Sequence, residues 1–228
     1  MKVKSLFLSL TKFELGLWLS SVCVTVVSYF FSGNSGLFEM FSTIVGVTAL
    51  IFVAKGYVIG QALTVVFGLL YAYTSFECKY YGEMITYLFM AAPIALMATI
   101  EWIRHPYKDT KVVEVSRVNK KQLTIMCVLS IIVTVLLYFA LKYLGTSNLF
   151  FSTISVTTSF VAAYLTYLRS PYYGLGYAAN DVVLIILWVL MSIDDISYLP
   201  MIACFVMFLL NDLYGFMNWK KLSKEQHK

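Results

Sequence analysis

Two stretches near the end of the chain decide the fold: residues 172–193, YYGLGYAANDVVLIILWVLMSI, and residues 198–219, YLPMIACFVMFLLNDLYGFMNW. Each is about as long as a helix that crosses a lipid bilayer, and each is mostly apolar. Yet the first contains Asn180-Asp181 and the second contains Asn211-Asp212. An ionisable group at membrane depth is costly unless it faces protein or water. The two stretches therefore predict transmembrane helices whose polar groups are turned toward the interior of a helix bundle.

The composition of the whole chain is that of an integral membrane protein. Of its 228 residues, 60% are hydrophobic and 13% are charged, and the mean hydropathy is +0.79, whereas soluble domains are about 25% charged. This length leaves room for roughly seven or eight helical crossings and for no soluble catalytic domain. The net charge of +5 is interpreted as a topology signal, and no nucleic-acid partner is predicted.

No metal site, cofactor or enzyme motif is predicted. The four cysteines are scattered without CxxC spacing, and neither histidine lies within a predicted span. Hydrolase, metalloprotease and ATP-binding signatures do not occur in the sequence. The chain is therefore predicted not to be an enzyme. A membrane-embedded enzyme that acts on a nucleotide or a lipid headgroup is kept as the alternative from another class.

Eight apolar runs are separated by Gly, Pro, Asn or charged residues. They are long and continuous, whereas the strands of a membrane β-barrel alternate with a period of two residues. The sequence therefore predicts an all-α integral membrane protein with about eight transmembrane helices. The predicted spans are residues 14–31, 37–54, 57–76, 81–103, 121–143, 148–168, 172–193 and 198–219.

The positions of the basic residues predict the orientation. With the N-terminus inside, all but two of the 17 Lys and Arg residues fall on the cytoplasmic side, and the exceptions are Lys79 and Lys142. Short cytoplasmic loops are enriched in Lys and Arg. We therefore expect a multi-pass protein of the plasma membrane, surrounded by membrane lipid, with both termini in the cytoplasm.

The chain contains an internal repeat. The sequence FSTI at residues 41–44 opens the second span, and it recurs at residues 151–154 at the start of the sixth span. Lys55 and Arg169, and then Trp102 and Trp219, follow at similar points of the two copies. The copies are four crossings apart, so their helices run in the same direction and the repeats are parallel. Transporters are commonly built from such repeats, with the substrate site between the two halves.

The repeat divides the chain into parts. The prediction is two parallel three-helix repeats joined by a linker helix (3+1+3), plus an extra N-terminal helix. Residues 1–36 form the cytoplasmic lead-in and the extra helix, 37–105 the first repeat, 106–147 the cytoplasmic loop and linker helix, 148–221 the second repeat, and 222–228 the cytoplasmic tail.

Several other features are expected to be structural. The loop of residues 105–120 is interpreted as a solvated connector. Trp102 and Trp219 lie near span ends, where aromatic residues commonly anchor helices at the membrane interface. Glu83 lies within a turn of a span end and is expected to reach the interface, and Pro93 is expected to kink the fourth span.

Helical spacing aligns polar and aromatic side chains in the two opening stretches. Tyr177, Asp181 and Trp188 are separated by four and seven residues, which places them on one helix face. Rings can stack on a heterocycle, amides can bond hydroxyl groups, and a carboxylate can balance a positive charge. Such a set suits a flat, polar organic solute that can carry a positive charge. The predicted substrate-binding residues are Tyr177, Asp181, Trp188, Asn211, Tyr214, Asn218, Gln61 and Tyr87.

A set of short motifs covers most of residues 37–221. The motifs are Lys55-Gly56, Tyr71-Ala72-Tyr73, Tyr81-Gly82-Glu83-Met84, Trp102, the run from Asp181 to Trp188 and the run from Asn211 to Trp219. Together they resemble the PnuC family of vitamin and nucleoside transporters. The resemblance implies a fold similar to SWEET sugar transporters, assembly as a homotrimer, and facilitated uptake of nicotinamide riboside. That NAD precursor is then trapped by a cytoplasmic kinase.

One family pattern is changed in this chain. Nicotinamide riboside carriers of the family show WxxWxxxN at the entry to the helix that here contains Asp181. Gly174 and Tyr177 stand at the two tryptophan positions, and Asp181 stands at the asparagine. Since other members carry thiamine or deoxynucleosides, one of these is the alternative substrate.

Overall fold

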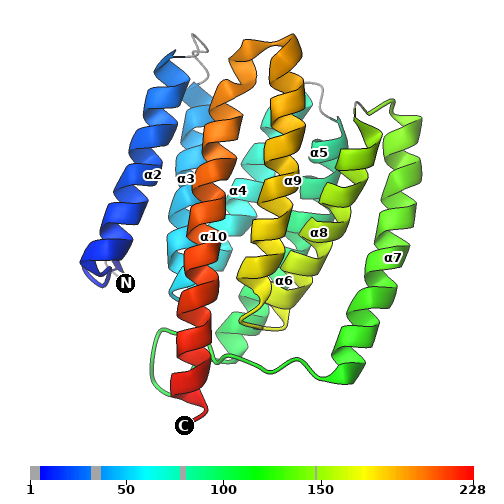
Figure 1. The fold of residues 1–228 in the computed structure, drawn as a ribbon. Coiled ribbons are helices and arrows are strands. Elements are labelled where there is room, and N and C mark those ends of the chain that lie inside the picture. The colour runs from blue at the N-terminus through cyan, green and yellow to red at the C-terminus, as the bar shows by residue number, and fades with distance from the viewer. Residues whose placement is uncertain (1–5, 32–36, 78–80, 147) are drawn as a thin grey trace.

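The predicted all-helical membrane fold is confirmed. A computed structural model describes residues 6–31, 37–77, 81–146 and 148–228. Three of the basic residues used to predict the orientation, Lys2, Lys4 and Lys79, lie outside the described residues. Within these ranges eight helical spans are long and apolar enough to cross a membrane, and Figure 1 shows them side by side. The helices are α2 (Lys12–Phe31), α3 (Leu37–Ala54), α4 (Val58–Glu77), α5 (Tyr81–Thr86), the π-helix η1 (Tyr87–Ala91), α6 (Ala92–Arg104), α7 (Lys120–Tyr143), α8 (Leu149–Tyr167), α9 (Tyr173–Asp194), the 3-10 helix η2 (Ile196–Tyr198) and α10 (Leu199–Gln226).

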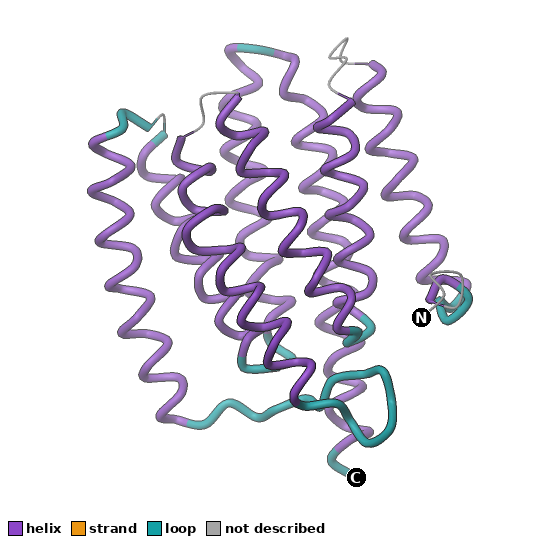
Figure 2. The backbone as a smooth tube through the Cα atoms, turned by 180° about the vertical axis from the view of Figure 1, so that it is seen from behind, coloured by secondary structure: helices purple, strands orange, loops and turns teal. Residues whose placement is uncertain are grey.

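Six of the spans form a closed ring. Each helix packs on the next in the order α3, α4, α6, α8, α9 and α10, and α10 closes the ring on α3. The third helix of each predicted repeat thus meets the first helix of the other. The remaining spans, α2 and α7, lie at the two edges in Figures 1 and 2. Only 22% of α2 and 11% of α7 is buried, against 33–50% for the other spans, as expected for helices that face lipid.

The outer helices occupy corresponding places. Helix α2 packs across the seam between α3 and α10, and α7 packs on α8 and also touches α5. Each outer helix therefore precedes a three-helix unit and lies beside the junction of that unit with the other one. The extra N-terminal helix and the linker helix thus hold comparable positions outside the ring of six spans.

The turns after α3 and α8 show the repeat in atomic detail. Gly56 and Arg169 both have positive φ, 71° and 56°. The Gly56 N–H donates to Val53 O, and the Arg169 N–H donates to Thr166 O. Gly56 is therefore the structural equivalent of Arg169, and the sequence pairing of Arg169 with Lys55 was wrong by one residue.

The interfacial role predicted for two tryptophans is wrong. Trp102 and Trp219 are both 0% exposed, and their rings contact each other with centroids 5.2 Å apart. The Trp102 Nε1–H donates to Thr166 O at 3.0 Å, and the Trp219 Nε1–H donates to Val53 O at 2.9 Å. Each tryptophan lies on the third helix of one repeat and bonds the first helix of the other. Glu83 is likewise buried, with 7% exposed, and does not reach the interface.

The fourth span departs from regular α-helical winding just before Pro93, and the kink expected there stays a prediction. A proline cannot donate to the carbonyl four residues earlier, and its ring crowds that carbonyl. Here the five residues of η1 immediately before α6 adopt the wider π-helical winding. Such π segments commonly occur at functional sites. This one contains Tyr87.

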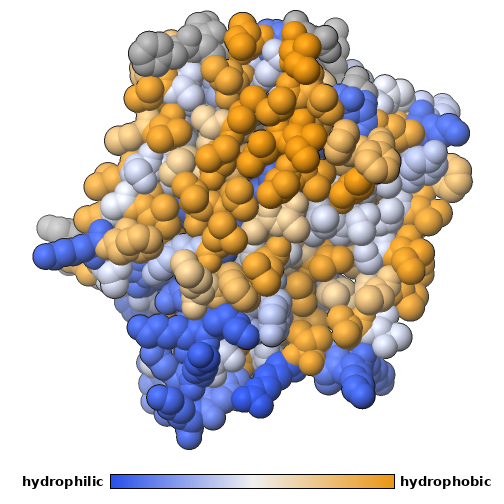
Figure 3. All heavy atoms as spheres, viewed as in Figure 1, coloured by the Kyte–Doolittle hydropathy of each residue, from blue (hydrophilic) through white to orange (hydrophobic). Residues whose placement is uncertain are grey.

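The central loop and the end of the chain are packed against each other, which the sequence did not predict. Most residues of the loop at 105–120 are exposed, as expected of a solvated connector, but Val113 and Val115 are 0% and 2% exposed and anchor the loop to the bundle. Helix α10 continues through the predicted tail, where Gln226 Nε2 donates to Val113 O and Gln226 Oε1 accepts from the Val115 N–H. The loop thus lies as a strap across the end of the bundle that carries both termini, where Figure 3 shows hydrophilic residues gathered.

Candidate functional site

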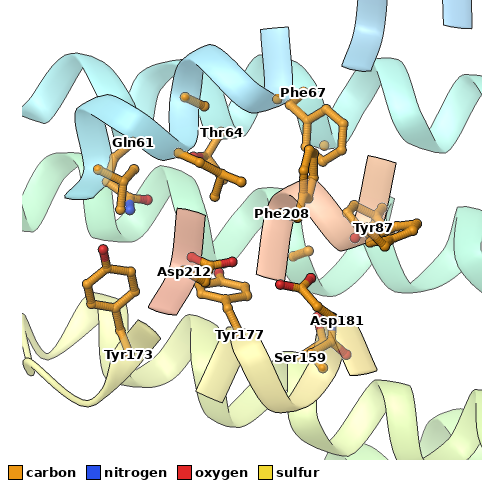
Figure 4. Close-up of a pocket in the computed structure, with 18 residues that line it drawn as sticks. Gln61, Thr64, Phe67, Tyr87, Ser159, Tyr173, Tyr177, Asp181, Phe208 and Asp212 are labelled. Atoms are coloured by element: carbon orange, nitrogen blue, oxygen red, sulfur yellow. The ribbon is translucent and has the colours of Figure 1, made fainter. Parts of the chain in front are cut away.

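A cavity lies between the two halves of the ring. Its walls come from α3, α4 and η1 in the first half, and from α8, α9 and α10 in the second. Figure 4 shows side chains from both halves pointing into this space. Transport sites in proteins built from repeats commonly lie at such an interface. The polar and aromatic lining consists of Gln61, Thr64, Phe67, Tyr87, Ser159, Tyr173, Tyr177, Asn180, Asp181, Phe205, Phe208 and Asp212.

Two carboxyl groups meet in the cavity. Asp181 of α9 and Asp212 of α10 are each 3% exposed, and their carboxyl groups are in hydrogen-bonding contact. The buried Oδ2 of Asp181 accepts no hydrogen bond from an N–H or hydroxyl group of the described residues. None of the described residues in the lining is Lys, Arg or His. The pair therefore holds negative charge, or one shared proton, without a basic side chain beside it.

Amide groups are available from both halves. The Asn180 amide is held from α8, because Thr158 Oγ1 donates to Asn180 Oδ1 at 2.8 Å and Ser155 Oγ donates to it at 3.4 Å. With its oxygen used in this way, Asn180 has its Nδ2 donors left for other partners. Gln61 of α4 faces the cavity from the other half and is 2% exposed. The two amides can bond hydroxyl or carboxamide groups of a ligand.

Aromatic rings form much of the remaining wall. The Phe67 ring meets Tyr87 at 6.1 Å and Phe208 at 5.5 Å, in both cases edge to face. Gly46 of α3 makes room for this arrangement, because a Cβ at that position would lie 2.8 Å from both Phe208 and Phe67. Ring faces and carboxylates together favour a flat organic cation.

The structure brings four of the predicted site residues together. Gln61, Tyr87, Tyr177 and Asp181 all line the cavity. They come from α4, η1 and α9, so the site combines both repeats. Their role in substrate binding stays a prediction, and these four are retained in the proposed site.

Two predicted residues face the outer helix α2 instead of the cavity. Asn211 Nδ2 donates to Ser21 Oγ at 3.0 Å. The Tyr214 hydroxyl donates to Glu14 Oε1 at 2.8 Å, and Glu14 also pairs with Lys55 Nζ at 2.8 Å. These contacts hold α2 against α3 and α10. Asn211 and Tyr214 are therefore left out of the proposed site.

The other two predicted residues also lie away from the cavity. Asn218 Nδ2 donates to Ala54 O at 2.8 Å, which ties the end of α3 to α10 beside the tryptophan contacts. Trp188 packs in the core and lines a separate pocket nearer the opposite end of the bundle. Neither contributes to the lining of the central cavity.

Several residues that line the cavity were not among the predicted substrate-binding residues. Asp212 is adjacent to Asn211 and is a second carboxylate at membrane depth, but helical spacing placed Asn211, and not Asp212, among the predicted substrate-binding residues. Asn180 precedes Asp181 and offers a second way to place the changed family pattern. With Asn180 as the asparagine, the tryptophan positions become Tyr173 and Gly176, and Tyr173 lines the cavity.

Comparison with known families identifies this architecture. The family model described as "Nicotinamide mononucleotide transporter" matches residues 36–221. The chain belongs to this family. The match covers both three-helix units of the ring and the linker helix between them. The resemblance deduced from the short sequence motifs is thereby confirmed.

Individual relatives agree over nearly the whole chain. The chain is 26% identical over 226 residues to the nicotinamide riboside transporter PnuC of Neisseria mucosa, covering 97% of this chain and 86% of that protein. It is 24% identical over 210 residues to the PnuC of Haemophilus influenzae, covering 91% and 89%. A crystal structure of the vitamin B3 transporter PnuC superposes with a TM-score of 0.82 and 26% identity, covering 96% of this chain and 94% of that one. The chain is a multi-pass membrane protein of a transporter family.

Proposed function

We propose that this protein carries nicotinamide riboside across the plasma membrane by facilitated diffusion. The observation that carries the proposal is the cavity between the repeats, where the Asp181 and Asp212 carboxyl groups meet among aromatic rings and no basic side chain of the described residues lines the wall. The relatives named as nicotinamide riboside transporters support the same substrate.

The chemistry of nicotinamide riboside matches this lining. Its pyridinium ring is flat and positively charged, so it can lie against Tyr87, Tyr177 or Phe208 while a carboxylate balances its charge. The carboxamide and ribose hydroxyl groups need hydrogen-bonding partners, which Gln61 and Asn180 can supply. A deoxynucleoside is neutral and would leave the carboxyl pair unmatched. Thiamine, which also contains a cationic ring, is the stronger alternative.

A matched pair of ligands tests the charge argument directly. The reduced 1,4-dihydropyridine form of nicotinamide riboside keeps the ribose and the carboxamide but loses the positive charge. We expect purified protein to bind the oxidised form at least about tenfold more tightly in calorimetric titrations, since a buried charge pair contributes about 1.5 kcal/mol or more. Equal affinity for the two forms would show that the carboxyl pair does not recognise a cation.

Variants then locate the site. Asp181→Asn and Asp212→Asn remove one charge each while keeping the side-chain shape, and each should weaken binding of nicotinamide riboside by about tenfold or more. Asp195→Asn is the matched control, because Asp195 lies outside the spans and only caps η2 through the Ser197 N–H. Thiamine and a deoxynucleoside are titrated alongside. Preferred binding of thiamine would replace the proposed substrate while leaving the site in place.

The cellular setting is part of the same proposal. The basic residues of the strap and of the end of α10 lie at the end of the bundle that carries both termini, and we assign this end to the cytoplasm by the positive-inside rule. A cytoplasmic kinase would trap the imported riboside by phosphorylation, so the carrier needs no energy source of its own. A carrier binds its ligand without altering it, and recovery of unchanged ligand from the purified protein tests this against an enzyme. Chemical cross-linking in the membrane tests the expected homotrimer.

A further inference from the structure

A second pocket lies at the end of the bundle opposite both termini. It is formed where α2 and α4 end and where α3 and α10 begin, together with the last part of α9. Under the proposed orientation this end faces the outside. The pocket is separate from the central cavity, and the two linings share no residue.

The lining of this pocket resembles that of the central cavity in chemistry. The Trp188 and Tyr198 rings contact each other with centroids 5.6 Å apart and planes inclined by 48°. Glu39, half-exposed in the first turn of α3, contributes a carboxylate. The Thr74 hydroxyl is buried, with 7% of the residue exposed, and has no hydrogen-bond partner among the described residues. Aromatic faces, a carboxylate and an unused hydroxyl suit a flat organic cation with polar groups.

Aromatic rings in contact with one another lie between the two chambers. Tyr71 lines the outer pocket and Tyr87 lines the central cavity. Their ring centroids are 4.4 Å apart with planes inclined by 59°, so the two tyrosines are in direct contact. Phe67 of the central cavity stacks on Tyr71 at 5.6 Å from the same helix. A solute in the outer pocket therefore meets the Tyr71–Tyr87 contact before it reaches the central carboxyl pair.

We propose that the outer pocket is an entry site, lined by Glu39, Tyr198 and Trp188, that binds the flat organic cation before it passes the Tyr71–Tyr87 contact into the central cavity. This inference rests on the proposed function for the direction of transport and for the charge of the substrate. A weak first site with the chemistry of the main site raises the local concentration of the cation beside the inner chamber. It also selects against anions before the inner chamber opens.

The test separates entry from central binding. Uptake of radiolabelled nicotinamide riboside is measured in cells that express the full chain, and equilibrium binding is measured on the purified protein. Glu39→Gln and Tyr198→Leu should each raise the KM for uptake by about threefold to tenfold, the range expected for one cation contact. The dissociation constant of the central site should stay unchanged, because neither residue lines the cavity.

Matched controls use neighbouring groups of the same kind. Glu77→Gln removes a carboxylate from the same end of the bundle, but Glu77 is exposed at the end of α4 and does not line the pocket. Tyr81→Leu removes a ring from the same end of the bundle, but Tyr81 is exposed at the start of α5 and does not line the pocket. Both should leave the KM unchanged, and gel filtration of all four variants checks that they remain folded.

Each outcome decides the proposal. An unchanged KM in folded Glu39→Gln and Tyr198→Leu variants overturns the entry site, as does a rise of the same size in the Glu77→Gln control. If the wild-type chain takes up thiamine but not nicotinamide riboside, the proposed substrate fails, and the same four variants are judged by the same criterion with thiamine. Uptake of neither cation refutes both proposals.

Discussion

The reciprocal tryptophan bonds predict how the cavity is closed toward the end that carries both termini. Trp219 of one repeat bonds Val53 O, and Trp102 of the other bonds Thr166 O, with donor-acceptor distances of 2.9 and 3.0 Å. Tyr173 lines the cavity and also packs on Trp219 with ring centroids 4.9 Å apart. The cavity therefore cannot open at this end unless the tryptophan contacts separate.

The size of the effect follows from what Trp219→Phe removes. The substitution keeps an aromatic ring but deletes the buried Nε1–H donor. Val53 O still accepts from the Gly56 N–H at 2.8 Å, so the acceptor is not left unpaired. The loss is at least that of one ordinary hydrogen bond, about 1 kcal/mol, and the smaller ring adds to it. This energy corresponds to a rise of at least about fivefold in the population open at this end. Because the two bonds are equivalent, Trp102→Phe should produce the same change.

Cysteine labelling measures that population. Ser159 lines the cavity and is 4% exposed, so Ser159→Cys is introduced into a chain from which the native cysteines have been removed. A membrane-impermeant thiol reagent is applied from the side of the termini, and both tryptophan variants should be labelled at least about fivefold faster. Trp18→Phe is the control, since the Trp18 Nε1–H donates to Thr48 Oγ1 at 3.1 Å outside the ring of helices. Unchanged labelling in both variants, acceleration in only one, or equal acceleration in the control would show that the two tryptophan bonds do not hold this end closed.

Three further predictions concern how the helices are held together. Gly174→Ala should lower the thermal unfolding temperature, measured by fluorescence in detergent, because the added Cβ would lie 2.6 Å from the Asp212 carbonyl oxygen and force α9 away from α10. Lys55→Met should cost about 3 kcal/mol or more in a denaturant titration by leaving the Glu14 carboxylate buried and unpaired, and adding Glu14→Gln should recover most of that loss. Gln226→Ala should speed amide hydrogen exchange in the strap, with no change in the spans, because it deletes two hydrogen bonds between α10 and the strap.

Much of the fold could be predicted because a lipid bilayer restricts the length and the type of the segments that can cross it. The hydrocarbon thickness sets the length of each crossing, and the observed ends lie within about two residues of the predicted ones except at the end of α10. That helix continues to Gln226 because the strap offers its side chain two backbone partners. Such a partner is distant in sequence, so no local pattern indicates where the helix stops.

The site was harder to predict for a related reason. Helical spacing shows which side chains share a face, but it does not show which helix covers that face. Asn211 and Asp212 are adjacent in sequence, yet Asn211 bonds α2 and Asp212 faces the cavity. The choice between them depends on α2 lying across the α3–α10 seam. In the same way, Trp102 and Trp219 lie near span ends as interfacial anchors do, and only the ring closure shows that they meet each other.

The carboxyl groups of Asp181 and Asp212, in the last two spans, have opposite effects on the empty and the occupied cavity. Two buried carboxyl groups in contact lower the stability of the empty protein, because their desolvation and mutual repulsion are offset only by sharing a proton. A lysine or arginine in the lining would remove this cost, but it would also occupy the place of a cationic substrate. The described lining instead leaves the pair without a basic partner, so a bound organic cation would supply the missing charge. The feature that makes the empty cavity costly is thus the one that would give the substrate its binding energy.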